Sequence, residues 1–349
     1  MTPKERMECV WEGRQPDRVP FVPAVYEQKA YLIKSTPSKV SRDAELLYRA
    51  MMVEYETYQA DALVIGMDVY NLEAEALGSK VTYYEGDDTS IPGIGAGNHG
   101  LHFGADLSGL KILNPLKDGR MPINLEVARR IAPLTRTVPV RGALSGPFSL
   151  ALSLLGPEAF FIGTIDDPDY CKRVLSFCAD TIIAFGRAYL DAGVSTIMFD
   201  SQASPDLLSP DMYVEMVLPH TQRVMKDLFA YGEKYCPLVI GGNTTLMLDA
   251  YIQSGTRQIL CDFSADWPIF RQRCQETGMA VRRNMNPIRV QKGKPEELAA
   301  AAKAYLADAK GMNGFILGTA VVPFGTPTEN LKAIRQVCLD ARQPTVGVV

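Results

Sequence analysis

Two aspartates stand where short apolar segments of this sequence end, and their side chains could do acid–base chemistry. Asp68 follows the segment Ala62–Met67, and Asp200 closes the segment Ser195–Asp200. A pair of carboxylates can serve as proton donor and proton acceptor when their surroundings push their pKa values apart. We therefore expect Asp68 and Asp200 to be catalytic. The alternative is that each caps a helix or pairs with an arginine.

Five further polar side chains lie at or just after the ends of other apolar segments. Hydroxyl, amide and cationic groups can orient a small molecule and can meet a carboxylate or a phenolate. We expect these five to bind a substrate. They are Tyr26, Lys29, Asn243, Arg282 and Asn284.

A metal site is less well defined by the sequence. His99 and His102 have a spacing that could supply half of such a site, although loop histidines are more often solvated. No motif supplies the remaining ligands. Candidate ligands for a metal are therefore His99 and His102 together with Glu73 and Glu75.

Arg141 lies inside the apolar segment Val138–Leu144, where a charged side chain is unusual. A buried charge left without its partner costs on the order of 3–5 kcal/mol. We expect Arg141 to contact a carboxylate or a bound anion.

Short apolar segments alternate with long helical patterns along the chain, which is typical of repeated βα units around a parallel sheet. Their number is that of a (β/α)8 barrel, in which the active site lies at the carboxyl ends of the strands. We expect a single barrel domain over residues 1–349. The predicted strands are Val19–Tyr26, Ala62–Met67, Val138–Leu144, Ser195–Asp200, Pro237–Gly242, Arg257–Asp262, Met279–Met285 and Gly314–Ala320.

The sequence also predicts the starts of two helices and one irregular insertion between the repeated βα units. Ser209 followed by Pro210 predicts an N-cap and a first helical residue. Thr326 and Glu329 have the spacing of a capping box at the start of the last helix. The Gly-rich segment of about residues 85–121 predicts an irregular insertion that serves as a lid or a binding loop.

Composition excludes several classes of function. The 349 residues carry a formal net charge of -4, so no global basic field favours nucleic acid or an anionic membrane. No apolar stretch approaches the ~20 residues of a membrane span, and charged residues occupy the N-terminus where a signal peptide would be apolar. The seven cysteines are scattered, which favours free thiols in the cytoplasm.

Several motifs, in order along the chain, resemble those of the uroporphyrinogen decarboxylase superfamily. This resemblance implies a distorted (β/α)8 barrel, and it suggests a homodimer by analogy. The motifs are Val138-Pro139-Val140 with Gly146-Pro147-Phe148, Phe199-Asp200-Ser201, Leu208-Ser209-Pro210 with Leu218-Pro219, Asp266-Trp267, Asn284-Met285-Asn286-Pro287 and Thr326-Pro327-Thr328-Glu329-Asn330.

The decarboxylase branch of this superfamily holds its tetra-acidic substrate with an arginine pair, an aspartate, a tyrosine and a late histidine. In this chain the first loop, Tyr26 to Tyr31, has no arginine pair. Ser153 falls at the tyrosine position, and Thr319 or Ala320 falls at that of the histidine. Of that set Asp68 remains. Because many carboxylates need charge-assisted donors, the missing arginines argue against that macrocycle.

The methyltransferase branch uses a zinc ion held by a His-x-Cys pair and a late cysteine. These positions correspond to Val239, Gly241 and Ala320, so zinc in the usual set is not expected, and neither is a standard thiol methyltransferase. The segment Leu72–Gly78, however, resembles that branch more than the decarboxylases.

We therefore expect a cobamide-dependent methyltransferase. It would move a methyl group between a small-molecule substrate and a cobamide (methylcobalamin-type) cofactor that a partner corrinoid protein presents. Two alternatives are a decarboxylase acting on a smaller acid, in which Asp68 stabilises developing positive charge, and a non-catalytic barrel that binds a ligand or a corrinoid protein.

Overall fold

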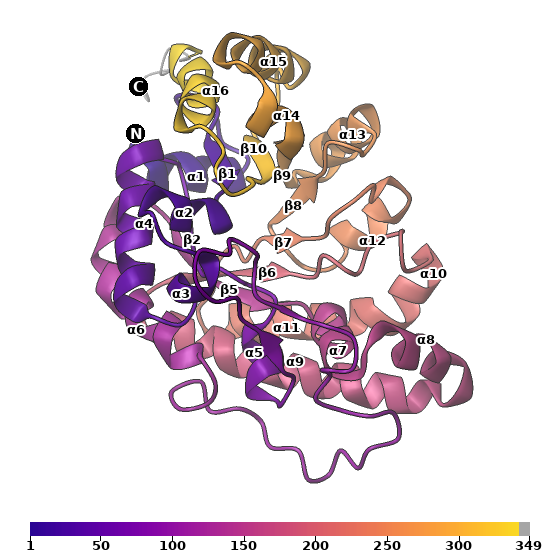
Figure 1. Cartoon of the computed structure of the whole chain (residues 1–349). Helices are drawn as coiled ribbons and strands as arrows, with labels where there is room; N and C mark the ends of the chain where they lie inside the picture. The colour runs from indigo at the N-terminus through magenta and orange to yellow at the C-terminus, as the bar shows by residue number, and fades with distance from the viewer. Residues whose placement is uncertain (342–349) are drawn as a thin grey trace.

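A computed structural model describes residues 1–341 and shows eight parallel strands arranged around one axis (Figure 1). Each strand overlaps one of the eight predicted segments, because β-branched and aliphatic residues are concentrated there. The strands are β1 (Phe21–Ala24), β2 (Leu63–Ile65), β5 (Val140–Ser145), β6 (Ser195–Phe199), β7 (Leu238–Val239), β8 (Gln258–Cys261), β9 (Ala280–Met285) and β10 (Phe315–Val321).

The barrel is distorted because its strands pair in two sets of four. One set has the order β1-β10-β9-β8 and the other has the order β2-β5-β6-β7. The pairing of β1 with β10 joins the two ends of the described chain. No ladder joins β1 to β2 or β7 to β8 within residues 1–341. The predicted distorted (β/α)8 barrel is confirmed.

A side chain bridges each of the two seams between the sets. At the first seam, the Asp61 backbone N–H donates to the Phe21 carbonyl (2.9 Å), and the Asp61 carboxylate accepts from the Phe21 N–H (2.7 Å). At the second, the Tyr251 hydroxyl donates to the Leu238 carbonyl (2.6 Å) and accepts from the N–H groups of Ile240 and Leu260 (3.0 and 3.1 Å). These bonds replace the missing ladder bonds, so the barrel stays closed.

The barrel interior is closed at the amino ends of the strands. Met7, Val10 and Trp11 of helix α1 (Pro3–Trp11) are buried there against inward-facing side chains of four strand regions. Burial of this apolar plug stabilises the base at roughly 25 cal/mol per Å² removed from water. The opposite end, where the carboxyl ends of the strands meet, is the mouth of the barrel.

Helices surround the barrel, and many begin with proline at a first-turn position, where its missing N–H is no loss. After α1 they are α2 (Glu27–Leu32), α3 (Pro37–Val40), α4 (Ala44–Tyr58), α5 (Leu72–Ala76), α6 (Met121–Ile131), α7 (Pro147–Leu155), α8 (Pro157–Asp166), α9 (Pro168–Asp191), α10 (Pro210–Met212), α11 (Leu218–Tyr231), α12 (Leu248–Ile252), α13 (Trp267–Thr277), α14 (Pro287–Lys292), α15 (Pro295–Asp308) and α16 (Thr328–Asp340). No single helix among them is long and apolar enough to cross a membrane, and α7 with α8 meet that test only as a pair bent by 102°.

The two predicted helix starts have different outcomes. The Ser209 side chain accepts from the Met212 N–H (3.2 Å), which confirms the predicted N-cap. The predicted capping box is wrong, because the Thr326 hydroxyl donates to the Pro323 carbonyl (2.7 Å) and Pro327 is the N-cap of α16. The Thr326 hydroxyl forms a hydrogen bond within a local turn, and it does not accept from the Glu329 N–H as a capping box requires.

Residues 83–120 form a mostly irregular segment between α5 and α6, seen along the lower edge of the molecule in Figure 1. Its strand β4 (Gly93–Ile94) pairs antiparallel with β3 (Val81–Thr82). The Leu101 N–H donates to the Leu154 carbonyl (2.9 Å), and the Phe103 ring packs edge-on against Tyr170 with centroids 4.9 Å apart. These contacts hold the segment against the helices outside the barrel.

Candidate active site

A small cavity of about 90 Å³ lies inside the mouth of the barrel. Residues at the carboxyl ends of β1, β6, β7, β8, β9 and β10 line it, together with Tyr70 beyond β2. This is where barrels of this kind place their active sites. The polar groups that line it are Tyr26, Tyr70, Ser201, Asp262, Arg282 and Asn284.

Arg282 is the cation of this cavity. It lies on β9, is 3% exposed and has no hydrogen-bond partner for its Nε atom. Its stem passes over Gly318 of the neighbouring strand, where a Cβ atom would lie 2.8 Å from its Cγ and Cδ. Burial lowers the pKa of Arg282, and Asp262 opposes this shift without forming an ion pair among the described residues. A cation in this position attracts an anionic ligand.

Aromatic rings form one wall of the cavity. The rings of Tyr26 and Tyr70 pack edge-on against Phe199, with centroids 5.7 and 5.8 Å away. The Tyr26 hydroxyl has no hydrogen-bond partner, whereas the Tyr70 hydroxyl lies 3.0 Å from Ser201 Oγ. Burial raises the pKa of both tyrosines, so their hydroxyls stay protonated and can donate.

Asn284 and Asp262 complete the polar lining. Asn284 is buried and its Oδ1 atom has no hydrogen-bond partner. Asp262 Oδ1 accepts from the backbone N–H and the hydroxyl of Ser264 (3.3 and 3.2 Å). Burial raises the pKa of Asp262, which brings it closer to neutral pH.

Three of the lining residues, Tyr70, Ser201 and Asp262, were not among the predicted site residues. Asp262 closes a predicted strand in the same way as Asp200, so the strand-end criterion could have found it. Ser201 directly follows Asp200, and its backbone turn carries it into the mouth. Tyr70 lies in the loop after β2, for which the sequence carries no comparable signal.

Asp68 does not line this cavity. Its carboxylate accepts two hydrogen bonds from Arg120, at 3.0 Å from Nη1 and 2.7 Å from Nη2. The Arg120 Nε donates to Glu75 (2.5 Å), and Asn71 contacts Asp68 from the other side (3.4 Å). Asp68 is therefore part of a buried ion-pair network that anchors the end of the segment 83–120, the role named as its alternative.

Asp200 is directed toward a helix instead of the mouth. It is 1% exposed, and its carboxylate accepts from the backbone N–H groups of Ser149 (2.7 Å) and Phe148 (3.4 Å) at the start of α7. Burial raises its pKa to about 6. A carboxylate at this position interacts favourably with the helix dipole. Gly146 is required beside it, since a Cβ there would lie 2.1 Å from the Asp200 side chain.

Two of the predicted substrate-binding residues also lie elsewhere. Lys29 is fully buried between α2 and α4, where its Nζ atom lies 3.2 Å from Glu54 and donates to the Val64 carbonyl (2.9 Å). Asn243 is exposed in a turn, and its Oδ1 accepts from the hydroxyl of Thr245 (2.6 Å). Of the five predicted residues, Tyr26, Arg282 and Asn284 thus meet in the cavity.

The four candidate metal ligands do not form one site. Glu73 accepts from the N–H and hydroxyl of Ser145, and Glu75 pairs with Arg120. His99 Nδ1 contacts a backbone carbonyl outside the barrel (3.0 Å), and His102 lies in the irregular segment. Residues 1–341 contain no cluster of three or more His, Cys, Asp or Glu side chains able to hold a metal ion.

The positions that correspond to the superfamily's zinc ligands do lie in the cavity. Val239, Gly241 and Ala320 all line it, and none of these side chains carries a donor atom. Zinc needs nitrogen, sulfur or oxygen ligands, so these three positions supply none for a zinc ion, and Asp262 is the one carboxylate among the described residues that line the cavity. All seven cysteines are free and buried, in agreement with the predicted thiols.

Arg141 lies near the closed base of the barrel. Its guanidinium packs 4.7 Å from the centre of the Trp11 ring, and its Nη atoms have no hydrogen-bond partner among the described residues. The predicted contact with a carboxylate is wrong for the described residues, where the aromatic face of Trp11 lies against Arg141 instead. A contact with a bound anion stays a prediction. Burial lowers its pKa to about 9, and the nearby Arg282 adds to this effect.

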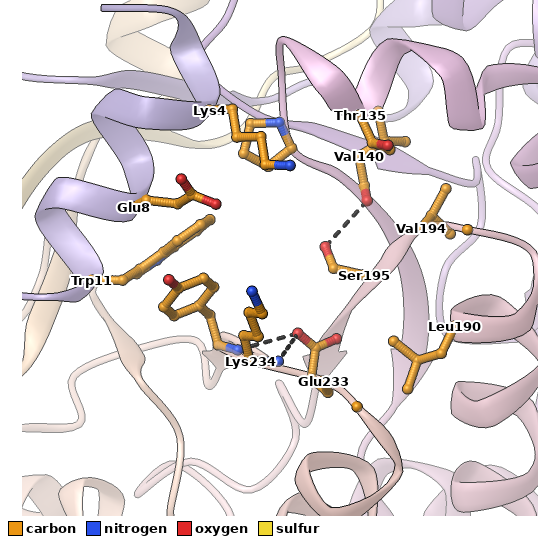
Figure 2. A pocket seen from close by; sticks show the side chains of 14 residues that line it. Lys4, Glu8, Trp11, Thr135, Val140, Leu190, Val194, Ser195, Glu233 and Lys234 are labelled. Atoms are coloured by element: carbon orange, nitrogen blue, oxygen red, sulfur yellow. Dashed lines mark hydrogen bonds between the residues drawn. The ribbon is translucent and has the colours of Figure 1, made fainter.

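A second pocket, of about 330 Å³, lies at the amino ends of β5 and β6, outside the plug (Figure 2). Lys4, Glu8 and Lys234 surround it, and the stacked rings of Trp11 and Tyr235 form one wall. Residues at this end of a barrel serve stability, whereas those at the mouth serve catalysis. The smaller mouth cavity is therefore the candidate active site.

Comparisons with known proteins show what this chain is similar to. The chain is 27% identical over 337 residues to the methylcobamide:CoM methyltransferase MtbA of Methanosarcina mazei, covering 95% of this chain and 96% of that protein. It is 26% identical to a uroporphyrinogen decarboxylase of Syntrophotalea carbinolica, covering 92% and 90%. A solved methyltransferase from Methanosarcina mazei shares the fold with a TM-score of 0.84 at 22% identity, covering 97% and 99%.

The family model described as uroporphyrinogen decarboxylase (URO-D) matches residues 2–340. This match extends over the whole barrel, from α1 to the end of α16. It confirms the resemblance found in the sequence motifs. The chain therefore belongs to the uroporphyrinogen decarboxylase family.

Proposed function

We propose that this protein is a corrinoid-dependent methyltransferase that moves a methyl group between a small substrate and a cobamide presented by a separate corrinoid protein. The observation that carries the proposal is the small polar cavity inside the mouth, at the carboxyl ends of the strands. The relatives named as methylcobamide:CoM methyltransferases support it. Because those relatives are 26–27% identical, the substrate of this protein is left open.

The cobamide would supply the cobalt atom that gives or takes the methyl group. The residues of this chain would bind and orient the small substrate below the mouth. Arg282 and the hydroxyl of Tyr26 supply hydrogen-bond donors, and the amide of Asn284 fixes the orientation. Asp262 holds or releases a proton at its carboxyl group when the atom that carries the methyl changes charge.

Asp68 and Asp200 are assigned positioning roles in this proposal. Asp68 holds Arg120 at the end of the segment 83–120, and Asp200 holds the start of α7. Neither touches the cavity, so each acts through the residues that it fixes in place. Their substitution should alter the shape of the mouth and the stability of the fold together.

The test is methyl transfer with free cobalamin. The purified protein is incubated with reduced cobalamin and candidate methyl donors, and methylcobalamin formation is followed in the visible spectrum. We expect formation with the unaltered protein and with Arg283→Gln, whose side chain lies outside the barrel beside Asp308. We expect a loss on the order of 100-fold or more with Asp262→Asn, the size of a general acid–base contribution. No transfer in either direction with any donor, methylcobalamin included, would overturn the proposal.

A decarboxylase acting on a smaller acid is the second candidate, and the similarity to uroporphyrinogen decarboxylases favours it. Two observations weigh against uroporphyrinogen itself as the substrate and against the role of Asp68 in such an enzyme. A cavity of about 90 Å³ is far too small for a four-ring substrate, and Asp68 is engaged by Arg120. We expect no carbon dioxide release from uroporphyrinogen, and release that Asp68→Asn abolishes would restore this candidate.

A non-catalytic barrel is distinguished from both enzymes by ligand binding without turnover. The homodimer also stays a prediction. Sedimentation of the purified protein at several concentrations tests it directly.

A further inference from the structure

We infer that the mouth cavity recognises a small monocarboxylate, and that the Arg282 guanidinium supplies the positive charge that a zinc ion supplies at the corresponding place in the methyltransferase branch. This inference rests on the proposed function and adds to it the chemical class of the substrate. The carboxylate serves as a binding group and is unchanged by methyl transfer.

The first argument is the electrostatic state of Arg282. A buried cation without a counter-ion is unfavourable, because burial removes its hydration and nothing in the protein replaces it. Arg282 is 3% exposed, and its Nε has no partner among the described residues. By contrast its neighbour Arg283 points outward, pairs with Asp308 (2.9 Å) and lies over two aromatic rings. The fold gives Arg283 a counter-ion and two aromatic contacts, but among the described residues it gives Arg282 no counter-ion. Of these two arginines, Arg282 is therefore the one that needs a ligand.

The second argument is the set of unpartnered groups around Arg282. The Tyr26 hydroxyl and Asn284 Oδ1 are also buried without hydrogen-bond partners, and both residues line the same cavity. Buried polar groups are nearly always satisfied by protein, water or ligand. A carboxylate would accept from Arg282 and from the Tyr26 hydroxyl, leaving Asn284 Oδ1 to accept from a donor on the remainder of the molecule.

The third argument is the space left above the guanidinium. Gly318 admits the arginine stem, since any larger residue would collide with it. The three positions that correspond to metal ligands carry small or apolar side chains, Val239, Gly241 and Ala320. Arg282 is the one cation among the described residues that line the cavity. Its planar fork matches the geometry of a carboxylate in a bidentate contact.

The size of the cavity limits the ligand. About 90 Å³ admits an acid with a few non-hydrogen atoms beyond the carboxylate, and the ring wall of Tyr26, Tyr70 and Phe199 favours an apolar or methylated end. Asp262 lines the same cavity without forming an ion pair with Arg282, so it does not take the place of an anionic ligand at the guanidinium. A compact carboxylic acid that carries a transferable methyl group fits these limits.

The test is calorimetric titration of the purified protein, without cobalamin, using acetate and methoxyacetate and the neutral amide acetamide as probes. We expect the two acids to bind and acetamide to bind at least tenfold more weakly, as a charged hydrogen bond predicts. Arg282→Met should abolish acid binding, and Arg282→Lys should weaken it severalfold by losing the fork. Arg283→Gln is the matched control and should bind the acids as well as the unaltered protein.

Folding does not confound this test. Because Arg282 is unpaired, Arg282→Met should melt at the same or a higher temperature than the unaltered protein; Arg282→Lys keeps the charge and provides a second variant. Equal binding of acids and amide, or acid binding unchanged in both Arg282 variants, would overturn the inference. Acid binding that depends on Arg282 in a protein without methyl transfer would refute the proposed function and leave this inference standing.

Discussion

Glu73→Gln should stabilise this protein at alkaline pH, although it removes a charged residue that is hydrogen-bonded. Glu73 lies on α5 and is fully buried. Its oxygens accept from the Ser145 N–H (2.8 Å) and hydroxyl (3.0 Å). Burial raises its pKa to about 7 from 4.5, and no cation among the described residues opposes that shift. The glutamine amide can make both contacts without a charge.

The sign and size follow from proton linkage. Between pH 4.5 and 7 the folded protein keeps the Glu73 proton and the unfolded chain has lost it. Stability therefore falls as pH rises through this window, by about 3 kcal/mol for a shift of about 2.5 units. Glutamine does not titrate, so the variant escapes this loss. We expect it to match the unaltered protein near pH 4.5 and to exceed it by about 3 kcal/mol at pH 8.

Urea unfolding at pH 5, 6, 7 and 8 measures this difference, with the free energy of unfolding taken from the midpoint and slope. Glu75→Gln is the matched control on the same helix. Glu75 pairs with Arg120 (2.5 Å), so its substitution should destabilise at every pH. A stability difference for Glu73→Gln that does not change with pH, or a loss at pH 8 as large as at pH 5, would refute this reasoning.

Three other substitutions test contacts of the fold by urea or thermal unfolding. Asp68→Asn should cost about 3 kcal/mol, and less in an Arg120→Gln background because the pair is then already broken; additive costs would contradict this. Tyr251→Phe should cost about 2–3 kcal/mol by removing the hydroxyl that bridges β7 and β8, and an unchanged melting temperature would contradict that role. Lys29→Met should cost about 3 kcal/mol by leaving Glu54 buried and unpaired, and adding Glu54→Leu should recover most of the loss if the pair is the cause.

The strands were predictable because their signal is local. Each apolar segment must be buried on both faces of a barrel strand, so composition and length identify it without tertiary information. The seams were not predictable in the same way. Tyr251 bridges β7 and β8 through one hydroxyl, and nothing in its sequence neighbourhood distinguishes it from other core tyrosines.

The site was predictable in part, because strand ends do converge at the mouth. Arg282 and Asn284 stand at alternate positions of β9 and face into the barrel, and Tyr26 follows the end of β1. All three therefore reach the cavity. The side chains of Asp68 and Asp200 do not reach the cavity, because each binds a partner from another part of the chain. Arg120 comes 52 residues after Asp68, at the end of an irregular segment whose path no periodicity describes.

The apolar plug at the base has a consequence for kinetics. With α1 filling that end, the small substrate and the corrinoid protein of the proposed function must share the mouth as their route to the cavity. The small molecule then has to enter before its large co-substrate covers the opening, and the product leaves after that protein departs. We expect a compulsory order of binding, in which excess corrinoid protein slows turnover because it blocks the mouth before the small substrate has entered.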